Sequence, residues 1–158
     1  GHCIAVDPWF IVASAPDITP VIQAARGVND ARIGYTIDRC EDLIAQRSEA
    51  LVGCLGLSYK ANIDDLRESP AMAIVTALAG KHGPRLRVVE PNLRTLPDSL
   101  KAAGVELVDV DTALANCGVL LLLVDHDDFK MIGPEERATA LVYDSRGIWS
   151  GEDQGRVA

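Results

Sequence analysis

The chain has 158 residues, of which 48% are hydrophobic and only 4% aromatic, and its formal net charge at pH 7 is −8. This length allows one full hydrophobic core, which Val, Leu, Ile and Ala must build because aromatic side chains are so few. The 23 acidic against 15 basic residues argue against nucleic acid or an anionic membrane as a partner. An anionic small ligand is still allowed, provided that a few Lys or Arg side chains point toward it.

The first residues have the character of a chemical site rather than of the beginning of a domain. Cys3 is followed four residues later by Asp7, and we expect both to lie in an opening loop. A protein seldom begins in this way, so we expect the start to be a cut through a longer enzyme. Apolar residues at helical spacing then predict helical structure from about residue 18 to residue 47, with Gly27 and Gly34 as places where it could be interrupted. This segment precedes any sheet, so its apolar stripe needs a missing domain or a second subunit as its partner.

From residue 51 onward, short apolar strands alternate with helices. The clearest helix start is Ser69-Pro70, with Ser as the cap and Pro in the first helical position. The alternation predicts an α/β fold, a Rossmann-like doubly wound parallel sheet preceded by the helical segment. The strands are expected over 51–57, 86–90, 106–108, 119–124 and 141–144, and the helices over 70–80, 96–103 and 111–116, with another turn of helix beginning at Pro134.

Ligands of open α/β sheets bind beyond the carboxyl ends of the strands. Lys60 and Arg146 each follow a predicted strand, so they bring cations to the same edge, as a phosphate-bearing ligand requires. The polar loop over 59–70 runs from this edge to a helix N-terminus, a place that favours anions, so we expect it to be more than a solvated loop. The four strand ends carry Ser58-Tyr59-Lys60, Glu90-Pro91, Asp125-His126 and Asp144-Ser145-Arg146.

Gly53 and Gly56 do not have the spacing of the dinucleotide fingerprint G-x-G-x-x-G, and both lie in the predicted strand rather than in the turn after it. We expect them to be close-packing positions. His126 has acidic neighbours on both sides and is expected in an exposed acidic turn, while His82 is expected to be solvated. Trp149, near the end of the chain, could clamp a loop.

The four cysteines have no spacing typical of a metal site, and no disulfide framework is expected in a chain so rich in regular structure. We expect Cys40, Cys54 and Cys117 to be small core residues, because they lie in apolar periodic segments. The sequence contains no signal peptide and no apolar run of membrane length, since residues 119–124 are too few. We therefore expect a cytoplasmic protein without a metal.

Several segments resemble the UDP-glucose/GDP-mannose dehydrogenase family. Residues 1–11, GHCIAVDPWFI, are similar to the catalytic-cysteine segment of the branch that oxidises UDP-N-acetyl-D-mannosamine. Tyr59-Lys60 and the DDLRESP run over 64–70 resemble the hallmark of the family's UDP-binding domain, and residues 25–30 look like its inter-domain helix. Glu90-Pro91 stands where the family commonly has Asp-Pro, which is a mild departure.

The resemblance implies an NAD-dependent enzyme that oxidises the C6 alcohol of a UDP-sugar twice, to the uronic acid, through a cysteine thioester. It implies that Cys3 is the nucleophile and that Asp7 orients or deprotonates the water that releases the acid. By the same resemblance, Tyr59, Lys60 and Arg146 are substrate contacts and Arg67 is a contact of NAD.

The resemblance also divides the chain into a catalytic-cysteine loop with a central helical linker over 1–48 and a UDP-binding domain over 49–158. It implies a missing N-terminal NAD-binding domain, a fragment that is inactive alone, and a homodimer formed through the helical segment. The true substrate stays open, because enzymes of UDP-N-acetylglucosamine have closely similar cysteine segments. The alternatives are a non-catalytic nucleotide-sugar-binding and dimerisation module, or a receiver-like unit with Asp144 and Lys60 in phosphoacceptor chemistry, which the DDLRESP run disfavours.

Overall fold

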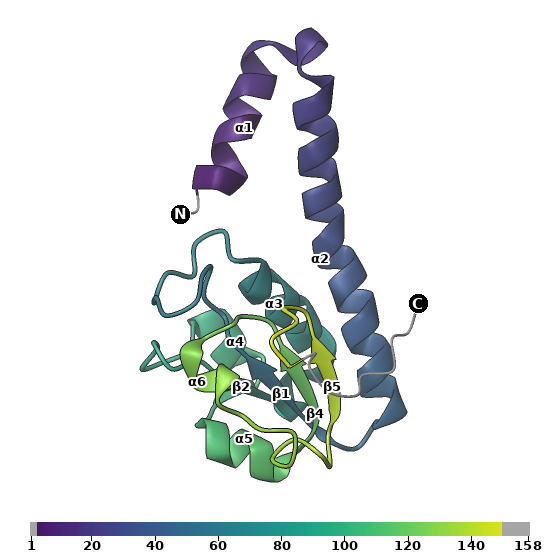
Figure 1. Cartoon of the computed structure of the whole chain (residues 1–158), viewed down its shortest axis with the longest axis vertical. Coiled ribbons are helices and arrows are strands. Elements are labelled where there is room, and N and C mark those ends of the chain that lie inside the picture. Colours follow the sequence, from purple (N-terminus) through teal and green to yellow (C-terminus); the bar gives the residue numbers. More distant parts are fainter. Residues whose placement is uncertain (1–2, 150–158) are drawn as a thin grey trace.

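A computed structural model of the chain describes residues 3–149. Two N-terminal helices, α1 (Cys3–Ser14) and α2 (Pro20–Gln46), are joined by the 3-10 turn η1 (Pro16–Ile18). They form a hairpin that projects from an α/β domain (Figure 1). The domain consists of β1 (Leu51–Leu55), α3 (Pro70–His82), the 3-10 turn η2 (Gly83–Arg85), β2 (Leu86–Val89), α4 (Asp98–Ala102), β3 (Glu106–Leu107), α5 (Val110–Asn116), β4 (Cys117–Leu122), α6 (Asp127–Lys130) and β5 (Leu141–Asp144).

The five strands form one parallel sheet in the order β3-β2-β1-β4-β5, which confirms the predicted doubly wound fold. The chain reverses its winding direction between β1 and β4, so the carboxyl ends of these two strands flank the place where such sheets bind ligands. Helices α2, α3 and α4 cover one face of the sheet, and α5 and α6 cover the other. The site is therefore expected at the edge where β1 and β4 end.

The three predicted core cysteines are buried free thiols, as expected. Cys40 comes from α2, Cys54 from β1 and Cys117 from β4, so they tie the long helix to the middle of the sheet. Burial raises the pKa of Cys40 to about 12 and that of Cys117 to about 11. These thiols stay protonated at neutral pH and act as small apolar side chains.

The residues expected to form an opening loop are in fact helix α1, so that expectation is wrong. The segment is almost entirely apolar and continues as a helix through Pro8, which removes one main-chain donor from its middle. The helix α2 is also continuous where an interruption near Gly27 or Gly34 was expected. Both glycines face open space, so no neighbour breaks the helix there.

The helical arm, residues 3–32, has few contacts with the domain. No residue of α1 is buried, and the exposed fractions of Val21 and Val28 on α2 are 79% and 72%. The other end of α2 packs on the domain through Cys40 and Ile44. Within residues 3–149, no helix is both long and apolar enough to span a membrane.

Gly53 and Gly56 are confirmed as close-packing positions. A Cβ on Gly53 would lie 2.9 Å from Cδ2 of Leu120 on the neighbouring strand. Gly56 has φ +93°, and a Cβ there would lie 2.4 Å from Cβ of Val124. The backbone can therefore turn out of β1 beside the end of β4 only because residue 56 has no side chain.

Three further expectations need correction or refinement. The segment from Pro134 forms turns and not a helix, and the helical turn of this region is α6, seven residues earlier. His82 is not simply solvated, because its Nε2 atom lies 2.9 Å from Oε2 of Glu41 and so links α3 to α2. Trp149 does clamp a loop: its indole N–H donates a hydrogen bond of 2.9 Å to the carbonyl of Phe129.

Candidate functional site

A cleft of ≈ 450 Å³ lies between the helical arm and the carboxyl edge of the sheet. Its walls come from α1, from the middle of α2, from the loop between β1 and α3, and from the ends of β4 and β5. The cleft brings together polar side chains that are far apart in the sequence. Its lining residues are Ile4, Ala5, Arg26, Asn29, Asp30, Arg32, Ile33, Thr36, Tyr59, Glu68, Pro70, Ala71, Ile74, Leu123, Ser145 and Arg146.

Two of the predicted substrate contacts, Tyr59 and Arg146, line this cleft. The Tyr59 amide donates a hydrogen bond of 2.8 Å to the Asp65 carbonyl, which closes the loop after β1 on itself. Arg146 lies beyond β5, where its Nε and Nη2 atoms are both 2.8 Å from Oδ1 of Asp125. Half of the Arg146 side chain remains exposed, so the guanidinium is held in place and still accessible from the cleft.

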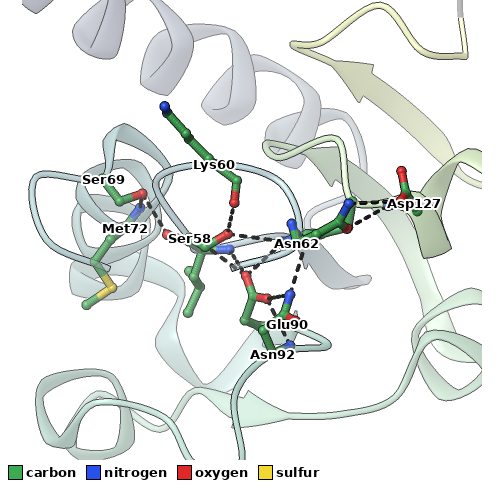
Figure 2. A network of polar contacts seen from close by, with 10 residues as sticks. Ser58, Lys60, Asn62, Ser69, Met72, Glu90, Asn92 and Asp127 are labelled. Atoms are coloured by element: carbon green, nitrogen blue, oxygen red, sulfur yellow. Dashed lines mark hydrogen bonds and ion pairs between the residues drawn. The ribbon is translucent and has the colours of Figure 1, made fainter. Parts of the chain in front are cut away.

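The third predicted contact, Lys60, lies beside the cleft but does not line it. Its carbonyl accepts a hydrogen bond of 2.7 Å from the Ser58 hydroxyl, which fixes the backbone at this position. Its side chain is exposed and points away from the polar network beneath it (Figure 2). The ammonium group is therefore open to solvent next to the cleft wall formed by Tyr59.

Cys3 and Asp7 are both exposed and lie one helical turn apart on α1, so they share one side of the helix. Cys3 directly precedes two lining residues, Ile4 and Ala5. The remaining predicted residue, Arg67, is exposed and makes a bidentate ion pair with Asp65. Its Nε and Nη2 atoms lie 2.8 Å from Oδ1 and Oδ2 of that carboxylate. Hydrogen bonds to Asp65 raise the pKa of the Arg67 guanidinium.

A buried polar network lies directly below the candidate site, where β1, β2 and β4 end (Figure 2). Oε2 of Glu90 accepts hydrogen bonds from the amides of Leu57 and Ser58, at 2.8 and 3.0 Å. The same oxygen lies 3.1 Å from Nε2 of His126. Nδ1 of His126 accepts a hydrogen bond of 2.9 Å from the Asn62 amide. The network thus ties the ends of three strands together beneath the loop that carries Tyr59 and Lys60.

The expectation that His126 lies in an exposed acidic turn is wrong, since its exposed fraction is 1%. Its ring points inward and meets the Phe129 ring edge-on, with 5.2 Å between the ring centroids. The acidic neighbours point elsewhere: Asp125 pairs with Arg146, and Asp127 pairs with Asn62 and Lys130. Sequence alone could not show this, because neighbouring residues at a strand end can face opposite ways.

The bonding pattern fixes the protonation state of the network. Nδ1 of His126 accepts a hydrogen bond from the Asn62 amide, so this nitrogen carries no hydrogen. The neutral imidazole therefore has its proton on Nε2, which points at Glu90. Burial alone would raise the pKa of Glu90. Hydrogen bonds from His126 and from the amides of Leu57 and Asn92 outweigh that effect and lower it to about 2. Glu90 is therefore a buried carboxylate at any physiological pH.

Arg26 is a candidate site residue that the sequence reasoning missed. It lines the cleft from α2, its side chain is 14% exposed, and its Nη2 atom lies 2.8 Å from Oδ1 of Asp30. Its Nε atom is buried without a hydrogen-bond partner among the described residues. In the sequence, Arg26 and Asp30 have the spacing of an ordinary ion pair on a helix surface, so only the largely buried Arg26 side chain marks the position.

The structure also bears on the phosphoacceptor alternative. Oδ1 of Asp144 accepts hydrogen bonds from the amides of Arg146 and Gly147, at 2.8 and 2.6 Å. Its Oδ2 accepts one of 2.8 Å from the Trp149 amide. The carboxylate thus forms the turn that places Arg146 at the cleft, and this role argues against Asp144 as a phosphorylation site.

Residues 53–151 match the family model of the UDP-glucose/GDP-mannose dehydrogenase family, UDP binding domain. Among curated relatives, an NDP-N-acetyl-D-galactosaminuronic acid dehydrogenase of Ralstonia solanacearum is 45% identical over 152 residues, which cover 96% of this chain and 36% of the relative. A UDP-N-acetyl-D-mannosamine dehydrogenase of Salmonella typhi is 45% identical over 157 residues, covering 94% of this chain and 37% of the relative. The chain thus spans little more than a third of the length of these relatives.

Solved structures agree with these matches. The UDP-N-acetyl-mannosamine dehydrogenase of Staphylococcus aureus superposes with a TM-score of 0.73 at 28% identity, over 98% of this chain and 36% of that one. The UDP-D-ManNAc dehydrogenase of Pyrococcus horikoshii gives a TM-score of 0.77 over 99% of this chain and 37% of that one, and at 21% identity it supports the fold alone. The resemblance seen in the sequence is confirmed, and the chain belongs to the UDP-glucose/GDP-mannose dehydrogenase family.

Proposed function

We propose that the chain is the C-terminal part of an NAD-dependent UDP-N-acetyl-D-mannosamine 6-dehydrogenase, with the catalytic cysteine and helical linker in residues 1–48 and the UDP-binding domain in residues 49–158. The observation that carries the proposal is the cleft. It places Tyr59 and Arg146 opposite the first turn of α1, directly after Cys3. A diphosphate bound at the strand ends would direct its sugar toward the helical arm, where the thiol lies. The names of the curated relatives support an N-acetylhexosamine nucleotide as the substrate class.

The sheet edge supplies cations for the diphosphate. Arg146 comes from the end of β5, Lys60 from the end of β1, and Arg26 from the opposite wall. An Arg fork suits phosphate oxygens, and Arg26 lines the cleft wall opposite Arg146. The chain as a whole carries a charge of −8, so these local cations decide where an anion binds.

Cys3 acts as the nucleophile in this proposal. Its thiolate adds to the C6 aldehyde to form a thiohemiacetal, and loss of hydride from that carbon leaves a thioester. Asp7, one helical turn away, accepts a proton from the water that attacks the thioester, which releases the acid and regenerates the thiol. Exposure of Cys3 fits this role, since the thiol must be reached by a sugar and by a hydride acceptor.

NAD, when bound, accepts the hydride in both oxidations. Arg67 is the residue of this chain that we assign to it, because the family resemblance gives it this role and its guanidinium is exposed. The ion pair with Asp65 holds that guanidinium in one direction. The NAD-binding domain itself lies outside this chain in our proposal, which agrees with a chain that covers 36% of a relative, and we expect no turnover by the chain alone.

Calorimetric titration with UDP tests the proposal. We expect saturable binding by the wild-type chain and its loss in the double variant Lys60→Ala, Arg146→Ala. Lys101→Ala is the matched control, because this lysine lies on α4 outside the cleft and should leave the affinity unchanged. Absence of UDP binding by a folded wild-type chain, or equal losses in the double variant and the control, would contradict the proposed site.

A further inference from the structure

The short segment Asp125-His126-Asp127, which follows β4, contacts both the loop after β1, which carries Tyr59 and Lys60, and the end of β5, which carries Arg146. Asp125 holds Arg146 beyond β5 through two contacts of 2.8 Å. Asp127 accepts a hydrogen bond of 2.9 Å from the Asn62 side chain, and its own amide donates to Oδ1 of Asn62 at 3.1 Å. The segment therefore links the loop after β1 to the end of β5, on both sides of the cleft.

His126 makes the central connection of this segment. Its Nδ1 atom accepts the Asn62 amide at 2.9 Å and lies 3.3 Å from Nδ2 of Asn92. Its Nε2 atom lies 3.1 Å from Glu90 and 3.3 Å from the hydroxyl of Ser58. Each ring nitrogen thus faces a different part of the loop after β1: Nε2 faces Ser58 near its beginning, and Nδ1 faces Asn62, four residues later.

The imidazole is held too firmly to take part in chemistry at the cleft. Its exposed fraction is 1%, it does not line the cleft, and the Phe129 ring packs against it. A buried ring with both nitrogens engaged acts by fixing its neighbours. Those neighbours are residues 58 and 62, which directly flank Tyr59, Lys60 and Ala61.

We propose that His126 is a positioning residue for nucleotide binding: the neutral imidazole holds the backbone of residues 58–62 in the conformation that presents Tyr59 and Lys60 to the ligand. This inference rests on the proposed function. The hydrogen bond that carries the effect is the one from the Asn62 amide to Nδ1, because Glu90 also holds Leu57 and Ser58 without the help of His126.

Two substitutions separate the two ring nitrogens. In His126→Asn, the amide oxygen can take the place of Nδ1 and accept the Asn62 amide, while the donor to Glu90 is lost. In His126→Gln, the side-chain amide nitrogen can take the place of Nε2 and donate to Glu90, while the acceptor for Asn62 is lost. His82→Gln is a matched control, because that imidazole joins α3 to α2 away from the loop.

The variants are compared by UDP titration and by hydrogen exchange of the Asn62 amide, followed by NMR. We expect His126→Gln to weaken UDP binding about tenfold and to speed exchange at Asn62, as the loss of one buried hydrogen bond implies. His126→Asn should keep the affinity within about threefold and keep Asn62 protected. Long-range ¹H–¹⁵N spectra of the wild-type imidazole should show a proton on Nε2 and none on Nδ1.

Wild-type affinity in a folded His126→Gln variant, or equal losses in the two variants, would overturn the proposal. So would rapid exchange of the Asn62 amide in the wild type. A wild-type chain that protects Asn62 and loses this protection in His126→Gln, yet does not bind UDP, would contradict the proposed function while supporting the role of His126 in holding the loop.

Discussion

At the scale of single residues, Glu90 determines how the end of β2 is connected to the loop after β1. Its carboxylate is buried and accepts hydrogen bonds from the main-chain amides of Leu57 and Ser58 and from the His126 imidazole. A hydrogen-bonded carboxylate is stable there, whereas a protonated one has one acceptor fewer and leaves a donor unpaired. The stability of the domain should therefore depend on the charge of this one side chain.

We predict that this dependence is visible as a function of pH. The folded state lowers the pKa of Glu90 from its ordinary 4.5 to about 2. Its stabilising contribution is thus fully present above about pH 5 and is lost as the pH falls through the range toward 2. Urea unfolding of the wild type between pH 6 and pH 2.5 should show a loss on the order of 2–3 kcal/mol from this group.

Glu90→Gln isolates this contribution from that of the other carboxylates. At pH 7 the variant should be less stable by about 2–3 kcal/mol, because a neutral amide replaces a carboxylate that accepts hydrogen bonds from Leu57, Ser58, Asn92 and His126. Below pH 3 the difference between the variant and the wild type should become small. A difference that stays constant across this range would show that the charge of Glu90 does not contribute to stability.

At the scale of elements, local signals made much of the fold predictable. The strands were visible as short apolar runs, and Ser69 was visible as a cap: its hydroxyl accepts the Met72 amide at 3.2 Å. It also donates to the Leu57 carbonyl at 2.6 Å, a contact between distant residues that no local pattern contains. The same limit applies to α1, in which no residue is buried, so its apolar residues do not form a core-facing periodic pattern.

The candidate site was predictable only in part, for a related reason. Arg146 and Tyr59 could be placed because parallel strands bring their carboxyl ends to one edge. The inward direction of His126 could not be read from its acidic neighbours, since it depends on acceptors and donors from β2 and from the loop after β1. Arg26 could not be found because its burial depends on a cleft formed between two elements.

The junction of β1 with its loop gives a prediction at this scale. Gly56→Ala should destabilise the domain by about 2–4 kcal/mol, because φ +93° is unfavourable for alanine and the new methyl would overlap Val124. Gly80→Ala is the matched control in the last turn of α3, where a Cβ meets nothing within 4 Å and helix propensity should add about 0.5–1 kcal/mol. Urea unfolding measures both, and equal effects of the two substitutions would show that the backbone at residue 56 is not constrained.

At the scale of the whole molecule, the helical arm is the part whose apolar side chains the rest of residues 3–149 leaves exposed. Ile18, Val21 and Val28 expose most of their apolar surface, and α1 beside them has no buried residue. Isolated apolar residues are common on protein surfaces, but a contiguous apolar hairpin of this length is typical of an interface. We propose that a second copy of the chain covers the arm, as the family resemblance implies.

We predict that the chain self-associates through this arm. Sedimentation velocity at increasing concentration should show a dimer, because burial of the arm removes apolar area from water at about 25 cal/mol per Å². Val21→Ser with Val28→Ser should shift the equilibrium toward the monomer without loss of helicity in circular dichroism. Met131→Ser is the matched control, an exposed apolar residue on the domain, 83% exposed and outside the arm, and should leave the dimer intact. If the double variant and the control sediment alike, the arm is not the surface through which two copies meet.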